Sequence, residues 1–312
     1  MSSLIEKAAQ RLEQLRKAGV ELNSPPVQPT PTPPSRGPAA ASSGAPVRPE
    51  APAAQQPVSR AVHLDLDRLM AAGYVTPNAP RSTVADQFRV IKRPLLANAA
   101  GKGAVAVRNG NLIMVTSALP GEGKSFTALN LAMSLATELD FHVLLVDADV
   151  ARPSLRRVLD LPAGPGLMDL LVKPDLPMAD VLLRTNIDKL SLLLSGTPHA
   201  RATELLASDG MTALVEEMGR RYPDRIIIFD SPPLLATTEA RVLATHMGQI
   251  VMVVQAERTL QSDLRHALAT IEQCPVKLLV LNQVRGGGQD SYGYGYGYGY
   301  GYGTDAAQPA AA

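Results

Sequence analysis

Short apolar runs alternate with longer amphipathic segments between residues 111 and 284. The runs are rich in Val, Ile and Leu and have the length of strands, while the segments between them have the apolar spacing of helices. Near-continuous apolar strands separated by helices are typical of a parallel sheet that is buried on both faces. The pattern therefore predicts an α/β fold with a doubly wound, mostly parallel sheet. The predicted strands are 112–116, 143–146, 190–194, 226–229, 250–254 and 278–281, and the predicted helices include 125–139, 211–221 and 260–273.

The remaining segments have other patterns. Residues 1–20 have the spacing of an amphipathic helix, which is too short to be stable alone and is expected to dock on a partner, unless it is a terminus without function. Residues 21–60 hold 11 of the 26 prolines, which predicts a disordered linker. A helical region follows at 61–100, then the sheet domain at 101–285. Residues 286–312 are a glycine- and tyrosine-rich tail that is expected to be disordered.

The chain has 30 basic and 29 acidic residues, so its formal charge is only +1. This balance argues against nucleic-acid binding, which needs a positively charged surface. Cys274 is the single cysteine, and the N-terminus lacks the pattern of a secretory signal, so we expect a cytoplasmic protein. No run approaches the ~18 apolar residues of a membrane-spanning helix, so any membrane role requires a partner.

A phosphate-binding motif follows the first predicted strand. Residues 118–125 read Ala-Leu-Pro-Gly-Glu-Gly-Lys-Ser and open a predicted helix, which is the context of a P-loop. Lys124 is expected to neutralise the β- and γ-phosphates of ATP, and the Ser125 hydroxyl to ligate Mg²⁺. Ala118 replaces the usual first glycine, which is tolerable if its φ is negative. An ordinary glycine-rich turn is the alternative, and the context argues against it. The predicted nucleotide-binding residues are Gly121, Glu122, Gly123, Lys124, Ser125 and Phe126.

Carboxylates end two further predicted strands. Asp147 and Asp149 follow the second, and Asp230 follows the fourth. The carboxyl ends of strands form the ligand crevice of an open α/β sheet, so we expect all three near Lys124. We assign Mg²⁺ to Asp230 and Asp149, and we assign Asp147 as the general base toward a tyrosine hydroxyl. The roles of Asp147 and Asp149 can be exchanged, and a helix cap or a turn bridged to Arg152 is the alternative.

The tail carries six tyrosines, each followed by glycine. Combined with the P-loop, the Asp-x-Asp at 147–149 and the Asp-x-Pro-Pro at 230–233, this tail resembles the bacterial tyrosine kinases, which are P-loop enzymes. Segments 4–19, 75–77 and 88–96 are most similar to the soluble exosortase A (XrtA)-associated tyrosine autokinases. The phosphoacceptors that this resemblance implies are Tyr292, Tyr294, Tyr296, Tyr298, Tyr300 and Tyr302.

The resemblance implies a non-specific protein-tyrosine kinase that uses ATP and Mg²⁺ and phosphorylates its own tail, in trans within a ring-shaped homo-oligomer. It also implies regulation of exopolysaccharide chain length and export. The implied partner is a separate, membrane-embedded polysaccharide chain-length determinant, which would recruit this chain to the inner face of the cell membrane.

Further positions follow from the same resemblance. Asp86, Arg89 and Lys92 are similar to the family's oligomerisation motif Glu-x-x-Arg-x-x-Arg, with both end residues changed, and a solvated helix face is the alternative. Asn282 resembles an asparagine that reads adenine, although a turn asparagine is equally compatible with its position. Ala151 stands where the family has an arginine, so the role of that arginine is not carried over.

Two other functions fit the fold. A Min- or Par-type positioning ATPase shares the P-loop, but those proteins have a second lysine at the position of Leu119 and no tyrosine tail. A scaffold without catalysis would leave Lys124, Ser125 and the strand-end carboxylates without a role. The sequence therefore favours the tyrosine kinase.

Overall fold

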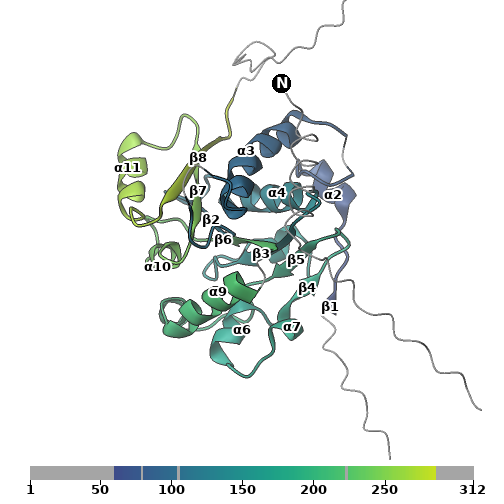
Figure 1. The fold of residues 1–312 in the computed structure, drawn as a ribbon, viewed down its shortest axis with the longest axis vertical. Coiled ribbons are helices and arrows are strands. Elements are labelled where there is room, and N and C mark those ends of the chain that lie inside the picture. The colour runs from purple at the N-terminus through teal and green to yellow at the C-terminus, as the bar shows by residue number, and fades with distance from the viewer. Residues whose placement is uncertain (1–59, 79, 104–105, 222–223, 286–312) are drawn as a thin grey trace, which may run out of the picture. The chain divides into compact units, whose positions relative to one another are not determined.

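The computed structural model describes residues 60–285, apart from 79, 104, 105, 222 and 223, and has an eight-stranded sheet with helices on both faces (Figure 1). The strand order is β1-β4-β5-β3-β6-β2-β7-β8, and every neighbouring pair is parallel except β4 with β5. The predicted α/β fold with a mostly parallel sheet is confirmed. The strands are β1 (Arg60–Ala61), β2 (Leu112–Ser117), β3 (His142–Asp147), β4 (Leu183–Arg184), β5 (Leu190–Leu193), β6 (Arg225–Asp230), β7 (Gln249–Gln255) and β8 (Val276–Asn282).

All six predicted strands are present, and two short ones, β1 and β4, were not predicted because two residues carry no periodic signal. The predictions for the N-terminal helix, most of the linker and the tail fall on residues 1–59 and 286–312, which lie outside the described residues. The helices are α2 (Leu66–Ala71), α3 (Thr83–Ala99), α4 (Lys124–Ala136), α5 (Leu155–Val158), α6 (Leu167–Val172), α7 (Met178–Val181), α8 (Ala202–Leu206), α9 (Asp209–Arg221), α10 (Glu239–Ala244) and α11 (Gln261–Ala269).

The sheet separates two apolar layers, because alternate residues of a strand point to opposite faces. In β2, Ile113 and Val115 pack in the layer covered by α2 to α5, whereas Leu112 and Met114 pack in the layer covered by α6 to α11. Figure 1 shows α3 and α4 together on one side of the sheet and α6 and α9 on the other. This two-sided burial explains why the central strands are apolar throughout.

The helical region 61–100 is part of the same compact unit as the sheet in the residues that the structure describes. Its helix α3 begins after Ser82, whose hydroxyl accepts a hydrogen bond from the Ala85 amide (3.2 Å). The helix continues through Pro94 and packs on α4, with Phe88, Leu95 and Leu96 in the shared apolar layer. The boundary predicted at residue 100 therefore separates two segments of one folded unit.

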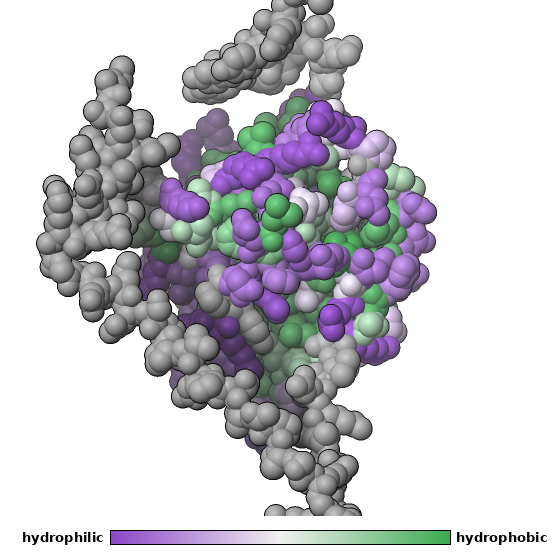
Figure 2. Space-filling model, turned by 45° about the vertical axis from the view of Figure 1, so that its right-hand side comes forward, coloured by the Kyte–Doolittle hydropathy of each residue, from purple (hydrophilic) through white to green (hydrophobic). Residues whose placement is uncertain are grey.

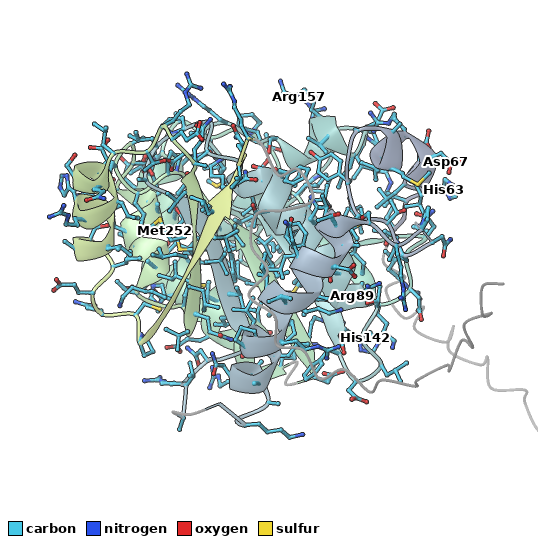
Figure 3. All side chains as sticks on the ribbon, turned by 90° about the horizontal axis from the view of Figure 1, so that it is seen from above. His63, Asp67, Arg89, His142, Arg157 and Met252 are labelled. Atoms are coloured by element: carbon cyan, nitrogen blue, oxygen red, sulfur yellow. The ribbon has the colours of Figure 1, made fainter. Side chains whose placement is uncertain are left out.

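The carboxyl ends of β2, β3 and β6 lie side by side. In the sheet register, Asp230 at the end of β6 pairs with Asp147 of β3 on one side and with Val115 of β2 on the other. Figure 3 shows the common direction of these parallel strands. The β8 arrow points toward the end of the sheet where Arg157 is labelled, and His142, the first residue of β3, lies at the other end. The topology therefore brings the P-loop and the strand-end carboxylates to one edge.

The surface differs from the two apolar layers. On the face shown in Figure 2, most of the described side chains are hydrophilic, and apolar ones occur in small groups between them. Within the described ranges, no helix has both the length and the apolar character needed to cross a bilayer.

Candidate active site

The P-loop joins β2 to α4, and its backbone requires glycine at two positions. Gly121 has a φ of +88° and Gly123 a φ of +95°, both in the left-handed region that L side chains rarely adopt. A Cβ on Gly123 would also lie 2.0 Å from Nδ2 of Asn282. Ala118 is not among the residues with positive φ, as the replacement of a glycine there requires. The loop thus has the conformation that the motif predicts.

Lys124 and Asp149 form an ion pair at this edge, with 2.7 Å between Nζ and Oδ2. Both side chains are largely buried, with 14% and 5% exposed. The other oxygen of Asp149 accepts a hydrogen bond from the backbone amide of Arg152 (3.2 Å). The ionic partner of the Asp149 carboxylate is therefore the P-loop lysine. The alternative, a turn in which Asp149 pairs with Arg152, is present only as a hydrogen bond from the Arg152 backbone amide.

Asp147 and Asp230 are buried beside each other, and both are under-satisfied. Oδ2 of Asp147 accepts a hydrogen bond from Leu155 N (3.3 Å). Oδ1 of Asp147 and both oxygens of Asp230 are buried without a hydrogen-bond partner in the described part of the chain. Burial, together with the negative charge of Asp230, raises the pKa of Asp147 to about 8. Burial also raises the pKa of Asp230 to about 6, and the charge of Lys124 acts in the opposite direction.

These oxygens fit a magnesium ion. Buried carboxylate oxygens without partners are rare in native structures and call for a ligand or ion. Mg²⁺ takes one or two carboxylates and fills its other positions with water and phosphate oxygens. The described residues contain no group of three or more acidic, His or Cys side chains arranged to hold a metal ion. The Ser125 hydroxyl lies close enough to Asp230 to lower its pKa, although no hydrogen bond of normal geometry joins the two side chains.

Three predicted nucleotide-binding residues have partners that the sequence does not indicate. The phenyl ring of Phe126 contacts the ring of Tyr74, with 5.1 Å between centroids and a tilt of 43°. Phe126 and Asn282 also line a cavity of about 450 Å³ between α3 and β8. The Glu122 side chain is only 2% exposed and bonds within the protein, to Leu119 N and to Thr259. Adenine recognition by Asn282 stays a prediction.

The predicted oligomerisation residues do not share one environment. Asp86 and Arg89 are exposed on α3 and form an ion pair with each other (Arg89 is labelled in Figure 3). Lys92 is only 2% exposed, and its Nζ pairs with Oε1 of Glu138 at 2.7 Å and donates to the Ser134 carbonyl at 2.6 Å. The Lys92 ammonium is therefore paired within the folded chain, and Lys92 is not part of the exposed face that Asp86 and Arg89 form on α3.

The parallel sheet, the P-loop and the buried carboxylates at its edge define a P-loop NTPase. A sequence model of the ParA family, described as NUBPL iron-transfer P-loop NTPase, matches residues 108–193. The tyrosine-protein kinase YwqD of Bacillus subtilis is 32% identical over 226 residues, which are 72% of this chain and 91% of YwqD. The chain belongs to the bacterial tyrosine kinase family.

Other relatives agree but share less of their length. The tyrosine-protein kinase ptk of Acinetobacter johnsonii is 35% identical over 184 residues, which are 58% of this chain but only 25% of ptk. Among solved structures, the chimerical protein CapA2B2 is similar with a TM-score of 0.57 and 27% identity, over 73% of this chain and 94% of CapA2B2. The kinase domain of the Escherichia coli tyrosine kinase ETK shares the fold, with a TM-score of 0.57 at 24% identity, over 77% of this chain and 94% of that domain.

Proposed function

We propose that this chain is an ATP- and Mg²⁺-dependent protein-tyrosine autokinase that phosphorylates the tyrosines of its own tail. The observation that carries the proposal is the convergence of Lys124 with three buried strand-end carboxylates at one edge of the sheet. The sequence adds six acceptor tyrosines only a short distance beyond β8. A nucleotide-hydrolysing site alone does not account for that tail.

Each side chain has a role in phosphoryl transfer. Lys124 neutralises charge on the β- and γ-phosphates. Ser125, Asp149 and Asp230 would hold Mg²⁺, which would supply further charge neutralisation at the transferring phosphoryl group. Asp147 accepts the tyrosine proton. Its pKa of about 8 keeps it largely protonated at neutral pH in the free protein. The nearby charge of Lys124 acts in the opposite direction and favours the ionised form of Asp147, which is the form that can accept a proton.

The biological setting that we propose rests on the family and on the sequence resemblance. The tail is phosphorylated in trans within a homo-oligomeric ring, and the chain acts in the cytoplasm on exopolysaccharide chain length and export. A membrane-embedded chain-length determinant recruits it to the inner face of the cell membrane. The sequence similarity of segments 4–19, 75–77 and 88–96 supports membership of the exosortase A-associated subgroup.

A positioning ATPase of the Min or Par type is the second candidate, because a ParA-family model matches residues 108–193. In the structure, Leu119 occupies the position of that class's second lysine and packs against the apolar layer. A leucine there cannot neutralise phosphate charge, which favours the kinase.

Phosphate mapping on purified protein tests the choice. We expect the full chain with Mg·ATP to acquire phosphate on tail tyrosines, and the Lys124→Met variant to acquire none, because removal of a transition-state charge contact costs on the order of 10²-fold or more in rate. Lys102→Met, an exposed lysine, is the matched control and should retain activity. ATP hydrolysis without tyrosine phosphorylation would favour the positioning ATPase.

A further inference from the structure

The carboxylate of Glu122 is buried in the loop to which it belongs, with 2% of the residue exposed. Oε2 accepts a hydrogen bond from Leu119 N at 2.9 Å, which closes the loop on itself. Oε1 accepts a hydrogen bond from the hydroxyl of Thr259, in the connection between β7 and α11. Both oxygens are thus held by neutral donors from the protein. A carboxylate that repels phosphate has no direct use in binding nucleotide, so its function must lie in these two contacts.

Two amide side chains hold the same loop by its backbone carbonyls. Nδ2 of Asn282 donates to the carbonyl of Glu122 at 2.9 Å, and Nε2 of Gln283 donates to the carbonyl of Gly121 at 3.1 Å. A P-loop points its N–H groups at the phosphates, so its carbonyls point away from them. The amides from the end of β8 therefore hold the loop by its carbonyls and do not occupy the N–H groups that would face phosphate.

The supporting residues are themselves connected. The Thr259 hydroxyl accepts a hydrogen bond from Gln255 N at 3.0 Å, and the Gln255 side chain donates to Oε1 of Gln283 at 2.6 Å. Gln255 ends β7, and Gln283 follows directly after β8. The end of the neighbouring strand pair is thereby tied to the P-loop at three points, through Thr259, Asn282 and Gln283.

We propose that Glu122 is a positioning residue, and that Glu122, Thr259, Asn282 and Gln283 form a clasp that holds the P-loop in its phosphate-binding conformation before nucleotide arrives. A loop with two glycines at positive φ has many alternative conformations, and ordering it on binding would weaken affinity. The clasp removes that loss by ordering the loop in advance. The proposal rests on the proposed function only in requiring that Mg·ATP is the ligand of the P-loop.

The test measures the dissociation constant of Mg·ATP for full-length variants by titration calorimetry. Thr259→Val removes one hydroxyl at constant shape and should weaken binding about 5-fold, while Thr259→Ser should bind as the parent does. Glu122→Ala removes both contacts and should weaken binding about 10-fold or more. Glu122→Gln keeps an acceptor for Leu119 N and a donor for Thr259, so it should recover most of the affinity. Glu257→Gln, an exposed neighbour, is the control for charge.

Coupling between the two sites provides a second criterion. If Glu122 and Thr259 act through their shared contact, the double variant Glu122→Ala/Thr259→Val should bind no more weakly than Glu122→Ala alone. Parent-like affinity of Thr259→Val and Glu122→Ala would overturn the proposal, and so would a Glu122→Gln variant as weak as Glu122→Ala, because charge would then be the cause. Tyrosine phosphorylation is followed in the same samples. If the variants change the affinity for Mg·ATP as expected but no sample, the parent included, acquires phosphate on tyrosine, the proposed kinase is refuted and the clasp is supported.

Discussion

The three aspartates of the site differ in their surroundings more than in their positions. Asp149 is neutralised by Lys124 at 2.7 Å, Asp147 has one amide donor, and Asp230 is fully buried with no hydrogen-bond partner in the described residues. A carboxylate that is buried without a partner is disfavoured in its charged form. Ionisation of Asp147 and Asp230 is therefore unfavourable in the free protein, and a bound cation would favour it.

The raised pKa of Asp147 should make the stability of the free protein depend on pH. Its pKa of about 8 exceeds the ~3.9 of an unfolded Asp, so the folded chain holds an extra proton between these values. Stability must then fall as the pH rises through that window. Asparagine cannot ionise, so Asp147→Asn removes this loss of stability at high pH. We expect the difference in melting temperature, variant minus parent, to increase by at least ~3 °C from pH 5 to pH 8 in EDTA.

The matched control is Asp140→Asn, the same substitution at an exposed position. It should show no such change in relative melting temperature between the two pH values. An Asp147→Asn variant whose melting temperature stays parallel to that of the parent would mean that Asp147 is ionised in the free protein.

Sequence reasoning reached the residues whose position follows from chain direction. Lys124, Asp147 and Asp230 each follow an apolar strand, and the polarity of a parallel sheet brings strand ends together. It did not reach the contact between Glu122 and Thr259, because 137 residues separate them and neither residue type is unusual in a loop. The burial of Lys92 was also missed, since a lysine at helical spacing reads as part of a solvated face.

At the scale of elements, the contact between α3 and α4 is where the helical region joins the sheet. The buried side chain of Lys92 extends from α3 toward α4. Its Nζ pairs with Glu138, just after the end of α4, and also donates a hydrogen bond to the Ser134 carbonyl. The charge of Lys92 and its hydrogen bond outweigh the effect of burial and lower the pKa of Glu138. This polar contact therefore fixes how α3 lies against the helix that begins at the P-loop.

Removal of this ion pair should destabilise the fold. Lys92→Ala should lower the free energy of unfolding by about 2–3 kcal/mol, below the ~3–5 of a fully buried pair, because Glu138 is partly exposed. Arg93→Ala, at an exposed position 3.5 Å from Glu138, should cost less than ~1 kcal/mol. Urea unfolding of both variants measures this. If Lys92 instead contacts a second copy, its substitution would change the mass in solution and leave unfolding of the monomer unaltered.

At the scale of the whole molecule, the strand that leads into the tail ends beside the P-loop, although the loop and the tail are far apart in the sequence. The P-loop follows β2, the tail follows β8, and Asn282 at the end of β8 contacts the loop itself. At ~3.3–3.6 Å per residue, Tyr292 lies at most ~25 Å from Arg285 and Tyr302 at most ~61 Å. Reach therefore permits a tail to enter either its own site or that of a neighbour, and only an experiment that separates the two chains can decide.

We expect transfer between chains. A full-length Lys124→Met chain, which keeps its tail but cannot transfer phosphate, is mixed with an active chain that lacks residues 291–312 and so has no acceptor tyrosines. Phosphate on the tail of the inactive chain, detected by mass spectrometry after addition of Mg·ATP, can arrive only in trans. The rate should rise with concentration, because two copies must meet, and substitution of the exposed pair by Asp86→Ala/Arg89→Ala should slow it if that face forms the contact. An unlabelled tail in the mixture, beside a normally labelled parent chain, would establish transfer within one chain and remove the need for a ring.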